Sequence, residues 1–123
     1  MAPKPKRTPR KRFKSQFRIY FGDEIALGPG KAELLNHIAE TGSIAESARR
    51  MDMSYNRAWL LVRTMNRCFH EPLVTASRGG DTHGGAMLTP TGKQVLRLYR
   101  QLESKVAAAS RPAVTQILSR LKD

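Results

Sequence analysis

The stretch "TGSIAESARRMDMSYNRAW", residues 41–59, decides the fold that the sequence predicts. Ser43 is a favourable N-cap residue, and Glu46 three residues later completes a capping box, so a helix should begin here. After about two turns the helix breaks at Asp52, and Ser54 offers a second N-cap. The stretch therefore predicts two helices that are joined by a very short turn.

Apolar residues mark the inward face of each helix in this pair. Pro72 prevents the second helix from continuing further along the chain. The inward positions that we expect are Ile44, Ala48 and Met51 in the first helix and Ala58, Val62, Met65 and Phe69 in the second.

The outward positions of the second helix carry no acidic residue. Asn, Arg and Ser side chains near a helix N-terminus suit the base edges of a DNA major groove. A solvated basic face is the ordinary alternative, because charged residues commonly cover protein surfaces. The short turn and the two caps favour a helix-turn-helix, whose second helix enters the groove. The outward residues are Tyr55, Asn56, Arg57, Arg63 and Arg67.

Glycines dominate the middle of "LVTASRGGDTHGGAMLT", residues 73–89, which has apolar ends. Two strands around a tip are the natural interpretation, and in a winged helix such a hairpin contacts phosphates or the minor groove. A nucleotide-binding phosphate loop is disfavoured, because the GxxxxGK[ST] motif is absent. The tip residues that we expect to contact DNA are Arg78, Gly79, Gly80 and His83.

Short apolar segments precede the helix pair. "FRIYF", residues 17–21, has the alternation of a half-buried strand, and a Gly-Asp turn leads to a second short strand at 25–27. Residues 31–42 have helical spacing, with Gly42 as the stop. We therefore expect a small hairpin followed by a helix.

A long amphipathic helix is predicted from Pro90 onward. Its apolar stripe is wider than a small core would cover, so part of it should pack on a second copy of the chain. Pro112 should separate a short amphipathic segment at 111–123 from this helix. The dimer interface that we expect contains Leu96, Tyr99, Leu102 and Val106.

The chain is strongly basic, with 22 Lys and Arg residues against 10 Asp and Glu residues and a formal net charge of +12. Such a charge attracts polyanions, either nucleic acid or an acidic membrane surface. Basic residues and prolines crowd the first 16 residues, which predicts a disordered basic arm that binds phosphates. The arm residues assigned to DNA are Lys4, Lys6, Arg7, Arg10, Lys11 and Arg12.

Composition disfavours several other classes of protein. A length of 123 residues fits one compact domain, which we place at 17–110. Neither a secretory signal nor a run of about 18 apolar residues is present, so we expect a cytoplasmic protein without a membrane partner. Cys68, His70 and His83 lack the spacing of a zinc site. We expect no enzyme activity, no metal and no cofactor.

Two stretches together resemble a known family. "IALGPGKAELLNHIAETGSIAESARRMDMSYNRAWLLVRTMNRCF" and "GGDTHGGAMLTPTG" resemble the N-terminal winged helix-turn-helix domain of ModE-type, molybdate-responsive transcription regulators, over about residues 17–106. "GSIAESARRM" and "SYNRAW" also look like the helix-turn-helix of LysR-type regulators. The resemblance implies a dimeric DNA-binding domain whose long helix lies in the dimer interface. It matches residues 54–57 to the start of the recognition helix and residues 78–86 to the wing.

The sequence departs from that family at its C-terminal end. Regulators of the family usually continue into a molybdate-binding region, whereas this sequence ends at Asp123. No residues correspond to that region, so the resemblance does not support molybdate binding by this chain.

The expected fold is mainly α with a small β component: a winged helix-turn-helix with an N-terminal hairpin and a long C-terminal dimerisation helix. The expected function is sequence-specific binding of double-stranded DNA by a homodimeric transcription regulator. Non-specific binding to DNA, as in a chromosome-organising protein, and recruitment of a protein partner by the C-terminal helices are the alternatives. DNA contacts from the helix pair are assigned to Ser43, Ser54, Tyr55, Asn56, Arg57 and Arg63.

Overall fold

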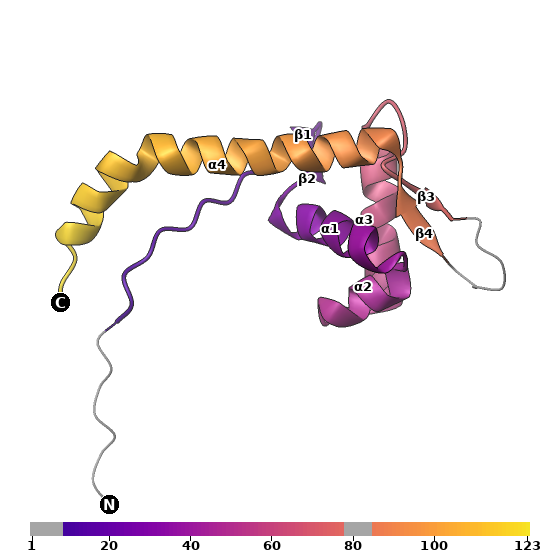
Figure 1. The fold of residues 1–123 in the computed structure, drawn as a ribbon, viewed down its shortest axis with the longest axis horizontal. Helices are drawn as coiled ribbons and strands as arrows, with labels where there is room; N and C mark the ends of the chain where they lie inside the picture. Colours follow the sequence, from indigo (N-terminus) through magenta and orange to yellow (C-terminus); the bar gives the residue numbers. More distant parts are fainter. Residues whose placement is uncertain (1–8, 78–84) are drawn as a thin grey trace, which may run out of the picture.

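The computed structural model describes residues 9–77 and 85–123, which form four helices and two small antiparallel sheets (Figure 1). The prediction of a mainly α protein with a small β component is confirmed. The elements are β1 (Ile19–Phe21), β2 (Glu24–Leu27), α1 (Pro29–Thr41), α2 (Ile44–Arg50), α3 (Tyr55–Cys68), β3 (Val74–Ala76), β4 (Ala86–Leu88) and α4 (Pro90–Ser119).

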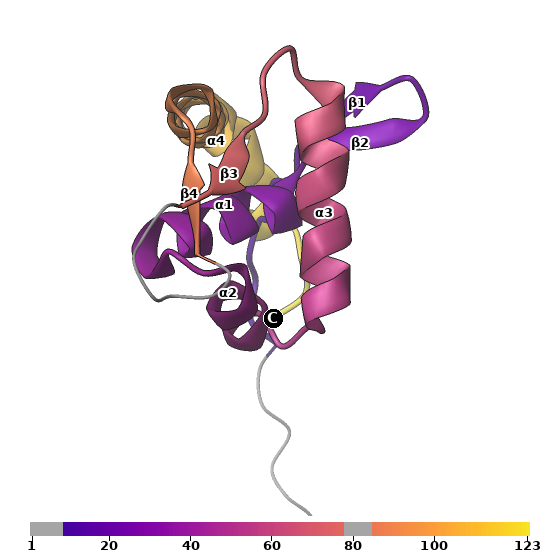
Figure 2. The ribbon, with the colours of Figure 1, turned by 90° about the vertical axis from the view of Figure 1, so that its right-hand side faces the viewer.

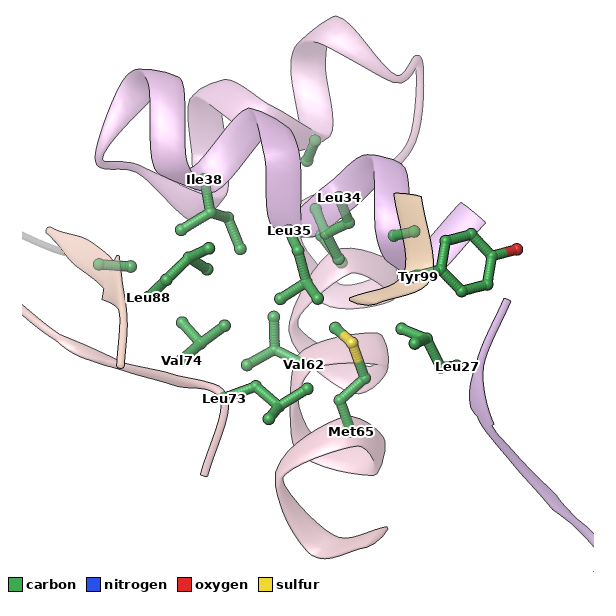
Figure 3. Close-up of a cluster of buried hydrophobic side chains, with 14 residues drawn as sticks. Leu27, Leu34, Leu35, Ile38, Val62, Met65, Leu73, Val74, Leu88 and Tyr99 are labelled. Atoms are coloured by element: carbon green, nitrogen blue, oxygen red, sulfur yellow. The ribbon is translucent and has the colours of Figure 1, made fainter. Parts of the chain in front are cut away.

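Helix α1 lies at the centre of the core, in contact with α2, α3, α4, β2 and β4. Its side chains Leu34, Leu35 and Ile38 are completely buried. Figure 3 shows them facing Val62 of α3 and Leu88 of β4. Burial of each such side chain contributes roughly 1.5–3 kcal/mol to the free energy of folding. Helix α1 therefore contributes strongly to the stability of the core.

Both N-caps predicted for the helix pair are confirmed. The Ser43 hydroxyl accepts a hydrogen bond from the Glu46 backbone N–H at 3.0 Å, and the Ser54 hydroxyl accepts one from the Arg57 N–H at 3.1 Å. The other half of the predicted capping box is not formed. The Glu46 carboxylate lies 2.7 Å from the Arg49 guanidinium instead, because an opposite charge one turn away competes with the backbone N–H.

The connection between α2 and α3 is closed by backbone hydrogen bonds. The Met53 N–H donates to the Ala48 carbonyl at 3.0 Å, and the Asp52 N–H donates to the Arg49 carbonyl at 3.1 Å. This is a Schellman arrangement, with Asp52 in the left-handed region at φ 54°. The turn therefore fixes the direction in which α3 leaves α2.

The first hairpin forms as predicted, but its first strand is more exposed than predicted. The three residues of β1 are all exposed, and only Ala26 and Leu27 of β2 are buried. A two-stranded ribbon offers too little surface to cover both of its faces. Phe17 lies outside the strand and packs on the edge of the core.

The second hairpin packs beside α1 and α3. Strands β3 and β4 pair antiparallel, with Val74 opposite Leu88 and Ala76 opposite Ala86. An isolated bridge between Ser43 and Gly85 joins the hairpin to the beginning of α2. The hairpin is therefore anchored to the helix pair, and its predicted tip lies outside the described residues.

Helix α4 contradicts the prediction of a break at Pro112. It begins at the predicted N-terminus, with the Thr89 hydroxyl accepting a hydrogen bond from the Gly92 N–H at 2.9 Å, and continues through Pro112 to Ser119. A proline removes one helical hydrogen bond and crowds the preceding turn, which bends a helix without necessarily ending it. Figure 1 shows α4 curving toward its C-terminal end.

Tyr99 belongs to the core of the subunit, where only 2% of it is exposed. Its hydroxyl donates a hydrogen bond to the Phe17 carbonyl at 2.9 Å. Burial raises the pKa of this phenol, which keeps the donor protonated. The prediction that Tyr99 contacts a second copy is therefore wrong, because its side chain is already covered by its own chain.

Candidate nucleic-acid interface

Helix α3 runs along one side of the molecule and exposes one face to solvent (Figure 2). Successive residues of an α-helix are separated by about 100°, so the buried positions determine which positions face outward. The buried residues of α3 are Ala58, Val62 and Met65. The opposite side carries Asn56, Leu60 and Arg63, and all three are exposed.

Asn56, Trp59, Leu60 and Arg63 line a shallow pocket of about 380 Å³ on this outward face. The Arg63 guanidinium carbon lies 5.6 Å from the centre of the Trp59 ring, which is the geometry of a cation–π contact. The sequence analysis assigned neither Trp59 nor Leu60 to the DNA contacts. Their position beside Asn56 and Arg63 places both residues in the candidate interface.

The hairpin side of α3 carries Tyr55 and Trp59. Both side chains line a pocket of about 250 Å³ between α3 and the β3–β4 hairpin, together with Val74 and Ala86. Trp59 is 42% exposed. It lines both this pocket and the pocket on the outward face. The helix and the hairpin consequently form one continuous surface.

Arg57 lies on the other flank of α3. It lines a pocket of about 300 Å³ together with Arg18, which precedes β1, and with Gly30 and Lys31 at the beginning of α1. Burial lowers the pKa of Lys31, and the charge of Arg57 acts in the same direction. Neighbouring helix positions do not face the same way, so Arg57 and Asn56 cannot both point along the outward direction.

Arg67, near the end of α3, is paired with the Glu24 carboxylate of β2. This hydrogen bond holds the pKa of Glu24 below its ordinary value. Burial and the neighbouring Glu24 raise the pKa of the Cys68 thiol. The last turn of α3 is therefore partly neutralised. Nearer the beginning of the helix, Arg57 and Arg63 have no acidic partner within the described residues. Within residues 9–77 and 85–123, no group of His, Cys, Asp and Glu side chains has the arrangement of a metal site.

The two serines assigned to DNA both serve as helix caps. Ser43 is half-buried, and its carbonyl also accepts a hydrogen bond from the Ser47 hydroxyl at 2.7 Å. Ser54 is exposed at the beginning of α3. Ser43 thus stabilises the base of the helix pair, whereas Ser54 remains accessible from outside.

Asn66 is a positioning residue that the sequence analysis missed. Its amide nitrogen donates to the Val74 carbonyl at 3.0 Å, and its amide oxygen accepts from the N–H groups of Leu73 at 2.8 Å and Val74 at 3.2 Å. These three hydrogen bonds attach β3 to α3. They set the position of the hairpin relative to the outward face.

The described part of the arm lies on the same side of α4 as the other helices (Figure 1). Lys11 Nζ is 3.3 Å from Asp123 Oδ1 and 3.4 Å from the Leu121 carbonyl oxygen. Exposed pairs of this kind contribute only about 0–1 kcal/mol, so the arm can exchange them for other partners. Arg10 and Arg12 are exposed. The assigned residues Lys4, Lys6, Arg7, Arg78, Gly79, Gly80 and His83 lie outside the described residues.

Helix α4 leaves an apolar surface uncovered. Leu98 and Leu102 are exposed, and with Ile19 and Phe69 they line a pocket of about 260 Å³ at the edge of the core. Leu96 and Val106 are half-buried.

None of the helices in the described part of the chain has the length and hydrophobicity that a bilayer span requires.

The chain is similar in sequence to two kinds of curated bacterial protein, transcriptional regulators and molybdenum-pterin-binding proteins. It is 42% identical over 81 residues to the molybdenum-pterin-binding protein MopB of Rhodobacter capsulatus, covering 66% of this chain and 30% of MopB. It is 38% identical over 84 residues to the molybdenum transport protein ModE of Azotobacter vinelandii, covering 68% of this chain and 31% of ModE.

A third relative carries the most explicit functional description. The DNA-binding transcriptional dual regulator ModE of Escherichia coli K12 is 39% identical over 71 residues, which cover 58% of this chain and 27% of that regulator. The chain thus spans less than a third of the length of the curated relatives that it matches. No protein-family model matches the chain.

Proposed function

We propose that the chain is a winged helix-turn-helix unit that binds a specific sequence of double-stranded DNA and regulates transcription in the cytoplasm. The observation that carries this proposal is the outward face of α3, where Asn56 and Arg63 are exposed without an acidic neighbour on that helix. The DNA-binding regulator among the curated relatives supports it. The names of other relatives refer to molybdenum, but those names describe those proteins. We propose no molybdate site in this chain.

In this proposal α3 lies in the major groove with its outward face toward the bases. Asn56 reads a base edge, because an asparagine amide can pair with adenine through two hydrogen bonds. Tyr55, Ser54 and Arg63 contact bases or the adjacent backbone. Arg57 shares its pocket with Arg18 and Lys31, so we assign this cluster of cations to phosphates rather than to bases.

The hairpin and the arm extend the contact surface. Asn66 holds the β3–β4 hairpin against α3, where Val74 and Ala86 line a pocket with Trp59. We propose that this hairpin is the wing and that it contacts the phosphate backbone. The basic residues of the arm supply further phosphate contacts that do not depend on sequence.

We further propose that the protein acts as a homodimer. The exposed apolar residues Leu98 and Leu102 of α4 are the surface for the second copy, together with Val106. A dimer presents two α3 helices to two half-sites, which would lie about 34 Å apart or a multiple of that distance. The binding site should therefore have two-fold symmetry.

Selection from a random library of DNA duplexes with the purified protein tests this proposal. The expected result is a two-fold symmetric motif that is enriched far above competing random DNA. Enrichment of no motif would overturn the proposal of sequence-specific binding, and equal competition by random DNA would favour a non-specific DNA-binding protein.

A further inference from the structure

Leu60 is an exposed apolar side chain at the centre of a polar and basic face. It is 60% exposed, one helical turn after Asn56 and three residues before Arg63. Single exposed leucines are common on protein surfaces and need no explanation of their own. Leu60 differs because it lines a shallow pocket together with Asn56, Trp59 and Arg63, on the helix that we propose to enter the groove.

We propose that this pocket binds the 5-methyl group of a thymine. The inference rests on the proposed function, because it requires α3 to lie in a major groove. Among the four bases of DNA only thymine presents a methyl group there, and apolar side chains are its usual contacts. Leu60 supplies the apolar contact, and Trp59 lines the same pocket.

The neighbours of Leu60 make DNA a better occupant than an apolar protein surface. Arg63 lies over the Trp59 ring and brings a positive charge to the pocket. The Asn56 amide, which also lines the pocket, offers both a donor and an acceptor. A protein surface covering Leu60 would have to desolvate the arginine, whereas a DNA groove offers it phosphates and base acceptors.

The spacing along α3 predicts where the thymine lies. Asn56 and Leu60 are four residues apart, which corresponds to about 6 Å along a helix axis. Neighbouring base pairs are separated by about 3.4 Å. The thymine should therefore lie within about two base pairs of the base that Asn56 reads, once in each half-site.

The test replaces each thymine of the selected site, one at a time, with deoxyuridine. This change removes the methyl group and leaves every hydrogen-bonding group in place. Loss of one buried methyl should weaken binding by the wild-type protein about fourfold for each half-site. The Leu60→Ala variant should bind the thymine and deoxyuridine versions of that site equally.

Ile117→Ala is the matched control. Ile117 is similar in size and 63% exposed, but it lies near the end of α4, far from α3 in sequence. The control should keep the preference for thymine, even where its overall affinity changes. Circular dichroism of the free proteins checks that each variant is folded.

Two results would overturn the inference and leave the proposed function intact. One is a selected motif in which no deoxyuridine substitution weakens binding. The other is a Leu60→Ala variant that retains the full preference for thymine. Failure to select any motif would instead overturn the proposed function, and this inference with it.

Discussion

At the scale of single residues, two polar side chains position the candidate interface through hydrogen bonds within the protein. Asn66 makes three hydrogen bonds to the backbone of β3, and Ser54 caps the helix on which Asn56 lies. Each of these residues is polar and half-buried or at a helix end, where its alternative is an unsatisfied backbone group. Base reading by Asn56 would thus depend on the hydrogen bonds that Asn66 and Ser54 make within the protein.

Asn66→Ala tests this positioning role. Removing the amide leaves two N–H groups and one carbonyl without their partner, so the free energy of unfolding should fall by about 1–3 kcal/mol. Urea unfolding measures the change. Asn36→Ala is the control. The Asn36 amide donates a hydrogen bond to the exposed Glu40 carboxylate, and loss of this bond should change stability by less than about 0.5 kcal/mol. Equal losses in the two variants would contradict the role of Asn66.

Sequence patterns predicted residue roles only where these depend on near neighbours. The caps at Ser43 and Ser54 follow from residues one turn away, and both are confirmed. Asn66 and Tyr99 act on partners in other elements, with Tyr99 bonded to a residue 82 positions away. Leu60 was missed because the outward face was searched for polar and basic side chains, which make the hydrogen bonds of base readout.

At the scale of elements, close backbone contact fixes α4 against Leu73, the residue before β3. A Cβ atom added to Gly92 would lie 2.1 Å from the Leu73 carbonyl oxygen and 3.0 Å from the Leu73 carbonyl carbon. The Leu73 carbonyl also accepts a hydrogen bond from the Thr89 N–H at 2.9 Å. The first turn of α4 therefore packs directly on the backbone that leads into the hairpin.

Gly92→Ala should destabilise the protein although alanine favours helices. The gain in helix propensity is at most about 1 kcal/mol, whereas forcing a side chain into a packed contact costs about 1–3 kcal/mol. Gly30→Ala in α1 is the matched control, because nothing lies within 4 Å of the added Cβ. Thermal unfolding should show a lower midpoint for the first variant and an unchanged or higher one for the second. A Gly92→Ala protein as stable as wild type would contradict the packing.

Element boundaries were predicted where a local signal ends the pattern. Gly42, in the left-handed region at φ 69°, ends α1 as predicted. Pro112 was interpreted as a break, but a helix that projects from the body can bend and continue past a proline. The exposure of β1 was also not predictable, because alternation alone does not show whether another layer covers a strand.

At the scale of the whole molecule, the uncovered surface of α4 supports association of two copies. The helix has 30 residues and is therefore about 45 Å long. Its contacts with the body involve its early turns, including Gly92 and Tyr99, which are its buried residues. Leu102 is 36% exposed at the point where α4 leaves the core.

Leu102→Glu should shift the protein from dimer to monomer, because a carboxylate in an apolar interface would lose its hydration. Sedimentation equilibrium measures the mass of each variant. Ser104→Glu on the same helix is the control, because Ser104 is exposed and lies two residues after Leu102, on the opposite side of the helix. The proposal fails if Leu102→Glu remains dimeric, or if the wild-type chain is monomeric at the same concentration.

Deletion of residues 1–14 tests the arm as a phosphate contact. Each neutralised phosphate contributes about −0.9 to the slope of log K against log salt concentration, so the deletion should flatten that slope. The effect should be the same for specific and random duplexes, because phosphates carry no sequence information. An unchanged slope would show that the arm does not bind the DNA backbone.

The central claim is that the outward face of α3 reads base pairs. Its most direct test is the affinity of Asn56→Ala for the selected site and for every single base-pair variant of that site, with Asn36→Ala as the control. The wild-type protein and the control should lose about 1–3 kcal/mol at the position that Asn56 reads, whereas Asn56→Ala should lose its discrimination there and keep it elsewhere. The claim is contradicted if Asn56→Ala discriminates at every position as the wild-type protein does.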